Sequence, residues 1–374
     1  MYKRTITERE AGQRFDKYLR KLLPEAGSGF LYKMLRKKNI VLNDKKADGS
    51  EKLVCGDTVA VYFSDETLNK FMGEKKSHNT AYSHNEHSDS KYLGKAHAGT
   101  KDIWLAKTNN DCKEAVNVIF ENEHILIADK PAGMLTQKAS AGDFSLNDWL
   151  INYMLTTKQI SEDELQTFKP SACNRLDRNT SGIVLCSKSV QGAQMLSEAL
   201  YSRNTKALHD IDTSHGYCSL HKYYILYVKG CVSEEKVLEG YLVKDEKNNK
   251  VDIYSEADSS RDKNDNSEKC SYICTKYVPI KREGDKTLLE VELITGKSHQ
   301  IRAHLASIGH PLLGDYKYGD KAWNDKYRRK FNIKYQLLHA YKVVFEELGA
   351  PFEDISGREF IAPLPEVFGM VEAI

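Results

Sequence analysis

The sequence lacks the features that mark membrane, disulfide-bonded and zinc-binding proteins. No apolar run approaches the roughly 20 residues that a membrane-spanning helix needs, and the start of the chain, MYKRT, has no apolar signal core. The eight cysteines show no paired spacing, because Cys270 and Cys274 are separated by three residues rather than two. A metal site or a disulfide framework is therefore not expected, and these absences predict a soluble, cytoplasmic protein with reduced thiols.

Two enzyme classes are excluded by incomplete motifs. Residues 295–298, TGKS, imitate the end of a phosphate-binding loop, but the first glycine of that motif would fall at position 291, which is Val291. His299 and His304 lie five residues apart without an HExxH pattern. The sequence therefore predicts neither a nucleoside triphosphatase of this type nor a zinc protease.

Net charge is also small, but it is unevenly distributed. The 374 residues carry a formal net charge of only +2, so any attraction to nucleic acid must come from local patches. Residues 1–63 alone hold fourteen Lys or Arg against eight Asp or Glu, a surplus larger than that of the whole chain. The length predicts two or three domains, and this basic segment is a candidate for one of them.

Residues 1–63 predict a small α+β domain. Phe15, Leu19 and Leu22 recur at helical spacing, and a second helix is expected over about 29–38. That helix would place Lys33, Arg36 and Lys37 on one face, opposite its apolar residues. Short strands are expected at 40–43 and 57–63. Taken alone, such a charged face is as consistent with a solvated surface as with a binding surface.

Between residues 64 and 113 the composition becomes polar, with Ser, His, Asn, Lys and Gly dominant. Four histidines lie at irregular spacing without an apolar frame, which favours a flexible linker over a metal site. A short segment around 103–105 has the apolar content to become ordered. Two further polar stretches, near 204–219 and 258–268, read as surface insertions in the domain that follows.

Residues 114–374 predict an α+β domain. Strands are expected at 116–120, 125–128, 183–187, 223–229, 272–279 and 287–293, and helices at 146–155 and 190–201. Strands and helices do not alternate regularly. This argues for a mixed, largely antiparallel sheet rather than a doubly wound parallel one.

The most informative segment is residues 173–182, CNRLDRNTSG. Asp177 lies between Arg175 and Arg178, directly before the apolar run 183–186. Neighbouring guanidinium groups favour the ionised carboxylate, and they supply cations that grip an anionic substrate. These residues are also ordinary turn formers, so a surface turn is an equally good interpretation of this segment alone.

Three other segments resolve that choice. Residues 293–305 read LITGKSHQIRAHL and continue into 309–319, GHPLLGDYKYG; residues 222–230 read KYYILYVKG; residues 127–133 read IADKPAG. Together with 173–182 they resemble, in order, the motifs of the RluA/RluC-type pseudouridine synthases, which modify structured RNA. The family patterns are roughly KPxG, HRLDRxTSG, KxYxALVxG and LxTGRxHQIRxHLxxxGHPxxGDxxYG. Asn174, Asn179 and Lys297 stand where the family usually has His, Asp and Arg, and none of them is the catalytic position.

The resemblance implies the fold, the reaction and the site. The fold would be a mixed sheet flanked by helices, with the active site in a central cleft. The reaction would be isomerisation of uridine to pseudouridine without a cofactor. Asp177 would be the catalytic carboxylate, Arg302 its salt-bridge partner, and Tyr224 the residue beneath the base. Arg178 would fill the space left by the displaced uridine or hold phosphate, while Arg175 and Lys222 are further substrate-binding candidates. Lys130 and His304 remain open between RNA contact and scaffold.

The amino-terminal segment resembles an RNA-binding domain shared with a small-subunit ribosomal protein. That module has a basic helix, a strand reading like IxVNG and a closing GDxV strand, matched here by residues 40–44 and 56–59. The resemblance implies RNA contacts by Arg14, Lys33, Arg36, Lys37 and Asn43. Large-subunit ribosomal RNA is then the expected substrate, with transfer RNA as an alternative. A non-catalytic RNA-binding or ribosome-assembly factor is the alternative from another class. A monomer is expected.

Overall fold

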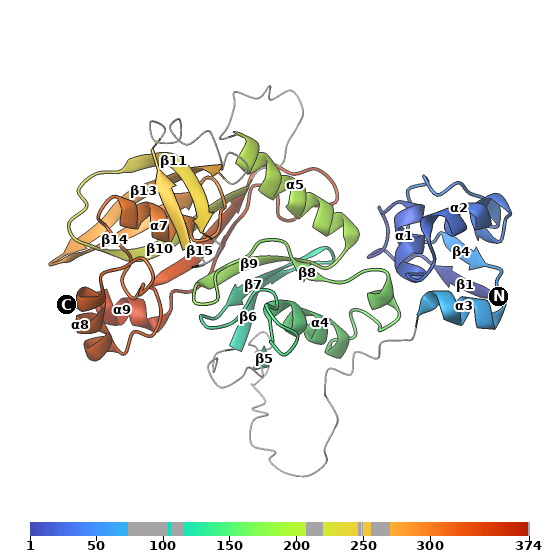
Figure 1. The fold of residues 1–374 in the computed structure, drawn as a ribbon, viewed down its shortest axis with the longest axis horizontal. Coiled ribbons are helices and arrows are strands. Elements are labelled where there is room, and N and C mark those ends of the chain that lie inside the picture. Colours follow the sequence, from blue (N-terminus) through green and yellow to red (C-terminus); the bar gives the residue numbers. More distant parts are fainter. Residues whose placement is uncertain are drawn as a thin grey trace, which may run out of the picture.

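The computed structural model describes residues 1–73, 104–105, 115–206, 220–245, 248, 250–255 and 270–372. The described residues form two sheets, one of four strands near the amino terminus and one of twelve in the remainder (Figure 1). The histidine-rich stretch of the expected linker and nearly all of the two expected insertions lie outside the described residues.

The amino-terminal domain contains the two helices and the two strands expected from the sequence, together with two short strands that were not predicted. Its antiparallel sheet has the order β1 (Tyr2–Thr5), β4 (Thr58–Val61), β2 (Ile40–Leu42) and β3 (Lys45–Lys46). Helices α1 (Phe15–Leu22) and α2 (Ser28–Arg36) pack on it through a buried cluster that includes Phe15, Leu19, Leu22, Leu31, Leu35 and Val59. The helical spacing of these apolar residues is what places them on one side.

The boundary expected at residue 63 is wrong. Helix α3 (Asp65–Met72) follows at once, with the Ser64 hydroxyl accepting a hydrogen bond from the Thr67 amide at its start. Its Leu68 is buried in the domain core, and Phe71 lies 4.6 Å from Phe30 between ring centroids. Because these apolar residues complete the core, the first domain extends to residue 72, into the segment expected to be a linker. The expected ordered piece near residue 104 is present as strand β5 (Trp104–Leu105).

The large sheet has the strand order β12-β11-β13-β14-β10-β15-β9-β7-β6-β5, with β8 and β16 pairing with β9 and β15. Its strands are β6 (Ala115–Glu121), β7 (Ile125–Lys130), β8 (Ser171–Ala172), β9 (Ser181–Ser187), β10 (Leu220–Lys229), β11 (Lys236–Asp245), β12 (Lys250–Tyr254), β13 (Cys270–Glu283), β14 (Lys286–Leu293), β15 (Leu338–Phe345) and β16 (Glu359–Ile361). Among the described strand pairs, only β9 and β15 run parallel. The mixed, largely antiparallel sheet expected from the sequence is thus confirmed.

Helices cover both faces of this sheet (Figure 1). Helices α4 (Leu146–Thr156) and α7 (Gln300–Ser307) contribute Leu150 and Ile301 to the same buried cluster as Tyr224 of β10. Helix α5 (Val190–Lys206) contributes Leu196 to a separate cluster on the other face. The short helix η1 (Glu164–Gln166) follows α4, and α8 (Lys321–Phe331) and α9 (Glu366–Glu372) near the carboxyl end complete the described helices. None of the described helices has the length and apolar character to span a membrane.

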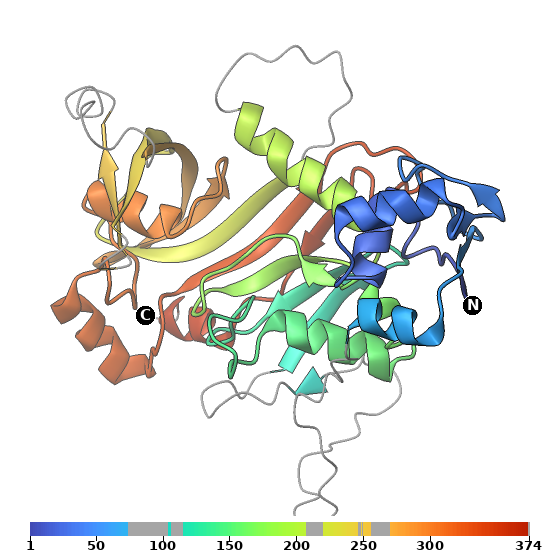
Figure 2. The ribbon, with the colours of Figure 1, turned by 45° about the vertical axis from the view of Figure 1, so that its right-hand side comes forward.

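The two domains touch near the start of α5 (Figure 2). The Val190 amide donates to the Arg9 carbonyl at 2.9 Å. The Glu10 carboxylate is fully buried and accepts from Arg4 at 2.8 Å and from the Thr167 hydroxyl. Polar contacts made by residues 4–12 therefore hold the amino-terminal domain against the larger domain.

Candidate active site

A cleft of about 680 Å³ opens on the face of the large sheet that carries Tyr224. It is lined by residues 135–139, by the 173–177 segment, by β10 and by residues 296–302. Among the described side chains that line it, Asp177 is the only acidic one. Six are basic: Lys138, Arg175, Lys222, Lys244, Lys297 and Arg302. A volume of this size is typical of ligand-binding pockets, and the charge favours an anionic ligand.

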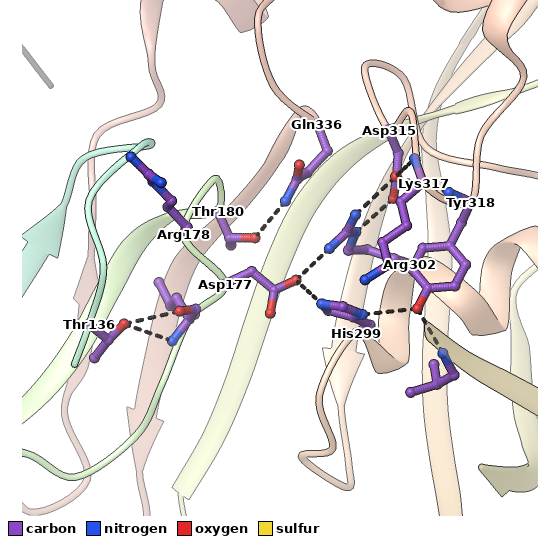
Figure 3. A network of polar contacts seen from close by, with 12 residues as sticks. Thr136, Asp177, Arg178, Thr180, His299, Arg302, Asp315, Lys317, Tyr318 and Gln336 are labelled. Carbon is purple, nitrogen blue, oxygen red and sulfur yellow. Dashed lines mark hydrogen bonds and ion pairs between the residues drawn. The ribbon is translucent and has the colours of Figure 1, made fainter. Parts of the chain in front are cut away.

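Asp177 is gripped by a buried arginine that is itself held by a second carboxylate (Figure 3). Arg302 Nη1 donates to Asp177 Oδ2 at 2.8 Å, while Nε and Nη2 donate to the two oxygens of Asp315 at 2.7 and 3.0 Å. The side chain of Asp315 is 1% exposed and that of Arg302 9%, whereas Asp177 keeps 27% of its side-chain surface open. The arginine is thus fixed by Asp315 and presents one donor to the more open carboxylate. The salt bridge implied by the resemblance is present.

Electrostatics reinforce this arrangement. Burial by itself lowers the pKa of Arg302, but the hydrogen bonds and charge of Asp315, with the charge of Asp177, outweigh burial and raise it. Burial likewise raises the pKa of Asp315, and the bonds from Arg302 and from the Lys317 and Tyr318 amides outweigh that effect and lower it. Both groups therefore stay charged at neutral pH, so Asp177 always faces a cation.

The segment that carries Asp177 is pinned on both sides. The Thr136 hydroxyl accepts from the Leu176 amide at 3.2 Å and donates to the Leu176 carbonyl at 3.0 Å. After Asp177, the Arg178 carbonyl accepts from the Gly133 amide at 2.8 Å and from Lys130 Nζ at 3.2 Å. Such bonds from a neighbouring loop fix the backbone of a functional residue more tightly than a turn alone would.

Gly182 lets this segment join the sheet. Its φ is +108°, and a Cβ atom there would lie 2.3 Å from the Ala340 carbonyl oxygen. Strand β9 therefore approaches β15 closely only because residue 182 is glycine. This contact fixes the start of β9, which directly follows the Asp177 segment along the chain.

Tyr224 and Lys222 lie on β10 with their side chains on the cleft side. The neighbouring Tyr223 points to the opposite face, where Lys342 lies 4.3 Å from its ring centroid, as strand alternation predicts. The pairing of β10 with β15 shifts register between Tyr223 and Tyr224. Bulges of this kind re-aim side chains and are common beside active sites.

The two arginines that flank Asp177 do not supply its ion pair. Arg178 points away from Asp177 (Figure 3) and its Nε donates to the Gly133 carbonyl at 3.0 Å. Arg175 is exposed at the cleft rim. The ion pair of Asp177 therefore comes from Arg302, as the resemblance implied, and the role of Arg175 and Arg178 as cations for an anionic substrate stays a prediction.

Two residues left open by the sequence are scaffold. Lys130 is fully buried, and its Nζ donates to the carbonyls of Pro131, Met134 and Arg178. His304 is buried, and its Nδ1 lies 3.1 Å from the Thr275 hydroxyl, away from the cleft lining. Burial lowers the pKa of His304 to about 4 despite a backbone hydrogen bond that raises it.

The expected RNA-binding residues of the first domain divide into two groups. Lys33, Arg36 and Lys37 are exposed together on α2 and the turn after it. Arg14 is exposed but pairs with Asp16 at 3.1 Å. Asn43 uses its side chain inside the domain, donating to Asp57 and accepting from the Thr58 amide. Because both of its polar atoms hold a turn, Asn43 is better explained as a structural residue.

Sequence reasoning gave no role to three residues that complete the network around Asp177. Asp315 holds Arg302, while His299 and Tyr318 lie next to the pair. All three fall within the motif at 293–319, so the signal was present. The pattern did not show that Asp315 would hold Arg302, or that His299 and Tyr318 would lie beside Asp177. Within the described part of the chain, no group of three His, Cys, Asp or Glu side chains is placed to hold a metal ion.

Comparison with known proteins finds similarity to RNA pseudouridine synthases. Residues 124–307 match the family model described as RNA pseudouridylate synthase. The chain is 27% identical to the ribosomal large subunit pseudouridine synthase C of Vibrio vulnificus over 91% of this chain and 87% of that one. It is 28% identical to the protein of the same name from Rickettsia bellii, over 96% of both chains. A solved structure of the human RNA pseudouridylate synthase domain containing 4 aligns over 67% of this chain and 90% of that one, with a TM-score of 0.49 and 18% identity.

Proposed function

This chain belongs to the RNA pseudouridylate synthase family and isomerises uridine in RNA, and we propose that its substrate is large-subunit ribosomal RNA and Asp177 its catalytic carboxylate. The observation that carries the assignment is the ion pair between Arg302 and Asp177. A single partly open carboxylate faces a basic cleft, and a buried arginine keeps that carboxylate paired with a cation.

The reaction needs no atoms beyond those of uridine. The bond from N1 to the ribose breaks, the uracil turns, and its C5 bonds to the ribose carbon while the hydrogen of C5 is released and N1 gains one. A carboxylate can serve the first step in two ways: by attacking the ribose carbon or by removing a ribose proton as the glycosidic bond breaks. In either route Arg302 orients Asp177, and Tyr224 supports the detached uracil.

The rest of the cleft is suited to a nucleotide drawn out of folded RNA. Displacing a stacked uridine costs a few kcal/mol, which contacts to its phosphates must offset. Arg175, Lys222 and Lys297 line the cleft as cations that can bind those phosphates. Arg178 is exposed, and we assign it the space vacated by the uridine or the adjacent phosphate. The proposed reaction requires no cofactor.

Ribosomal RNA is favoured over transfer RNA by the amino-terminal domain and by the similarity to ribosomal large subunit synthases over nearly the whole chain. The exposed cations of α2 provide a phosphate-binding surface that lies outside the cleft. A monomer is proposed as the working form. A ribosomal RNA substrate supports a cytoplasmic location, which is part of the proposal.

The proposal is tested by release of tritium from RNA that carries 5-tritiated uridine, because the isomerisation replaces the hydrogen at C5. The wild-type protein is expected to release label from large-subunit ribosomal RNA fragments. Asp177→Ala is expected to bind the same RNA without releasing label. Asp163→Ala, which changes an exposed aspartate of the same domain, is the matched control and should release label at the wild-type rate.

Label released by Asp177→Ala would remove Asp177 from the proposed role. Release from transfer RNA but not from ribosomal RNA would overturn the proposed substrate while leaving the site intact. Binding without release by the wild-type protein on both RNAs would point to an RNA-binding factor.

A further inference from the structure

His299 has a backbone conformation that an ordinary side chain adopts at a cost. Its φ is +57° and ψ is +11°, in the left-handed region, at the residue preceding α7. Histidine is not a residue that requires this conformation, and such strain at a site residue costs of order 1–3 kcal/mol. The conformation directs the imidazole into the cleft lining, between Asp177 and Tyr318 (Figure 3).

One ring nitrogen of the imidazole, Nδ1, contacts Tyr318. The Tyr318 hydroxyl oxygen accepts from the Val251 amide at 3.0 Å and lies 2.9 Å from His299 Nδ1. If the Tyr318 hydroxyl donates to Nδ1 while its oxygen accepts from the Val251 amide, the hydroxyl and Nδ1 both have their hydrogen-bonding capacity used. If Nδ1 instead carried the hydrogen, the hydroxyl proton would lose this partner.

The other ring nitrogen, Nε2, decides which of the two nitrogens carries the hydrogen. His299 Nε2 lies 3.9 Å from Asp177 Oδ2. A bare Nε2 lone pair facing a carboxylate is repulsive, whereas an Nε2–H group facing it is attractive. Asp177 and Tyr318 therefore select the same tautomer, with Nδ1 as acceptor and Nε2–H directed at the carboxylate.

The charges around the ring keep it in this neutral form. Burial is the largest effect lowering the pKa of His299. Arg302 and Lys317 lower it further, while Asp177 and Asp315 act in the opposite direction. The net pKa is below the usual value, so at neutral pH the ring is a neutral donor.

We propose that His299 is a positioning residue, whose Nε2–H closes onto Asp177 when RNA fills the cleft and donates to Oδ2, the same carboxylate oxygen that Arg302 binds. The inference rests on the proposed role of Asp177 and deepens it. A separation of 3.9 Å is too long for a hydrogen bond. Contacts of this kind in a ligand-free site are often long and tighten when the substrate binds. The carboxylate would then be oriented by two donors instead of one.

Two amide substitutions test which of the two ring nitrogens of His299 is needed. In His299→Gln the side-chain nitrogen can take the place of Nε2 and still donate to Asp177. In His299→Asn the shorter amide reaches only the place of Nδ1 and leaves Asp177 without its second donor. At saturating RNA, the rate constant for tritium release should fall about tenfold in His299→Asn and stay within about threefold of wild type in His299→Gln. The RNA concentration giving half the maximal rate should be unchanged in both.

The strained backbone supplies a stability control. Asparagine tolerates the left-handed conformation better than histidine does, so His299→Asn should unfold at the wild-type temperature or above. Loss of rate without loss of stability separates a role in the reaction from a role in folding. A thermal midpoint that falls together with the rate in His299→Asn would overturn the proposal, as would equal rates for the two variants.

Asp177→Asn in the same assay distinguishes failure of the role proposed for Asp177 from failure of the role proposed for His299. If Asp177→Asn releases label, the proposed catalytic role of Asp177 fails and the role of His299 fails with it. If Asp177→Asn is inactive and His299→Asn is as fast as wild type, only the role of His299 is overturned.

Discussion

Asp177 and Asp315 share one arginine but differ in exposure, and this difference assigns them different tasks. Asp315 is fully buried and accepts two bonds from Arg302 as well as the amides of Lys317 and Tyr318. Asp177 receives one bond from Arg302 and remains partly open to the cleft. A buried charge left without its partner is costly, whereas a partly solvated one is not.

The shared arginine predicts a separation of stability from activity. Asp315→Asn should lower the free energy of unfolding by about 3 kcal/mol or more, since it removes one charge of a buried pair. Asp177→Asn should change the free energy of unfolding by less than about 1 kcal/mol, because Arg302 keeps Asp315, yet abolish tritium release. Urea unfolding of both variants beside the wild-type protein provides the measurement. Equal losses of stability would show that the two carboxylates are not divided in this way.

At the scale of elements, α2 carries its proposed RNA-binding residues on the face that does not pack. Leu31, Met34 and Leu35 are buried in the domain, which leaves Lys33 and Arg36 exposed, with Lys37 directly after the helix. Each exposed cation that contacts a phosphate releases counterions from the RNA. Binding through α2 is therefore expected to weaken as salt rises.

Removing the three charges of this surface tests that expectation. Replacing Lys33, Arg36 and Lys37 together by Gln should weaken RNA binding and reduce the slope of log affinity against log salt by roughly 2 to 3. The matched control replaces Lys321, Arg329 and Lys330 of α8, three exposed cations at the opposite end of the molecule (Figure 1). Equal changes in slope for the two triple variants would show that RNA contacts of α2 are no different from a general effect of net charge.

The elements that the sequence predicts are those with a clear period. Helices α1 and α2 follow from apolar residues at helical spacing, and β6, β7, β10, β13 and β14 overlap the expected strands. Strand β15 was not predicted, because it lies between β10 and β9 and buries residues on both faces, so its sequence does not alternate. Helix α3 was missed because its polar composition concealed the few apolar residues that pack.

The site was predictable in part, from sequence motifs rather than from the spacing of apolar residues. Asp177, Tyr224 and Arg302 were identified by motif, and the structure brings all three to one cleft. The grip of Asp315 on Arg302, and the placing of His299 between Tyr318 and Asp177, depend on how α7 and the following loop pack against the Asp177 segment. No local pattern encodes that packing.

At the scale of the whole molecule, folded stability depends on histidines in opposite environments. His339 is almost fully buried, and burial is the largest effect on its pKa, lowering it to about 4 despite a backbone hydrogen bond that raises it. His221 lies between two carboxylates, with Nδ1 2.8 Å from Glu292 and Nε2 3.1 Å from Glu346. The hydrogen bond to Glu292 is the largest effect on the pKa of His221, which is raised.

These two environments predict opposite responses to acid. An unfolded histidine binds a proton near pH 6.5, whereas folded His339 stays neutral until about pH 4. Its contribution is therefore present above pH 6.5 and lost as pH falls toward 4, by about 2 kcal/mol at pH 5. His221 contributes stability that is present below pH 6.5 and lost as pH rises through its raised folded pKa. Urea unfolding at pH 7.5 and 5.0 should therefore show a smaller acid loss in His339→Gln than in wild type, and a larger one in His221→Gln. Shifts of the same sign in both variants would contradict this account, because burial and ion pairing act on the protonated ring in opposite directions.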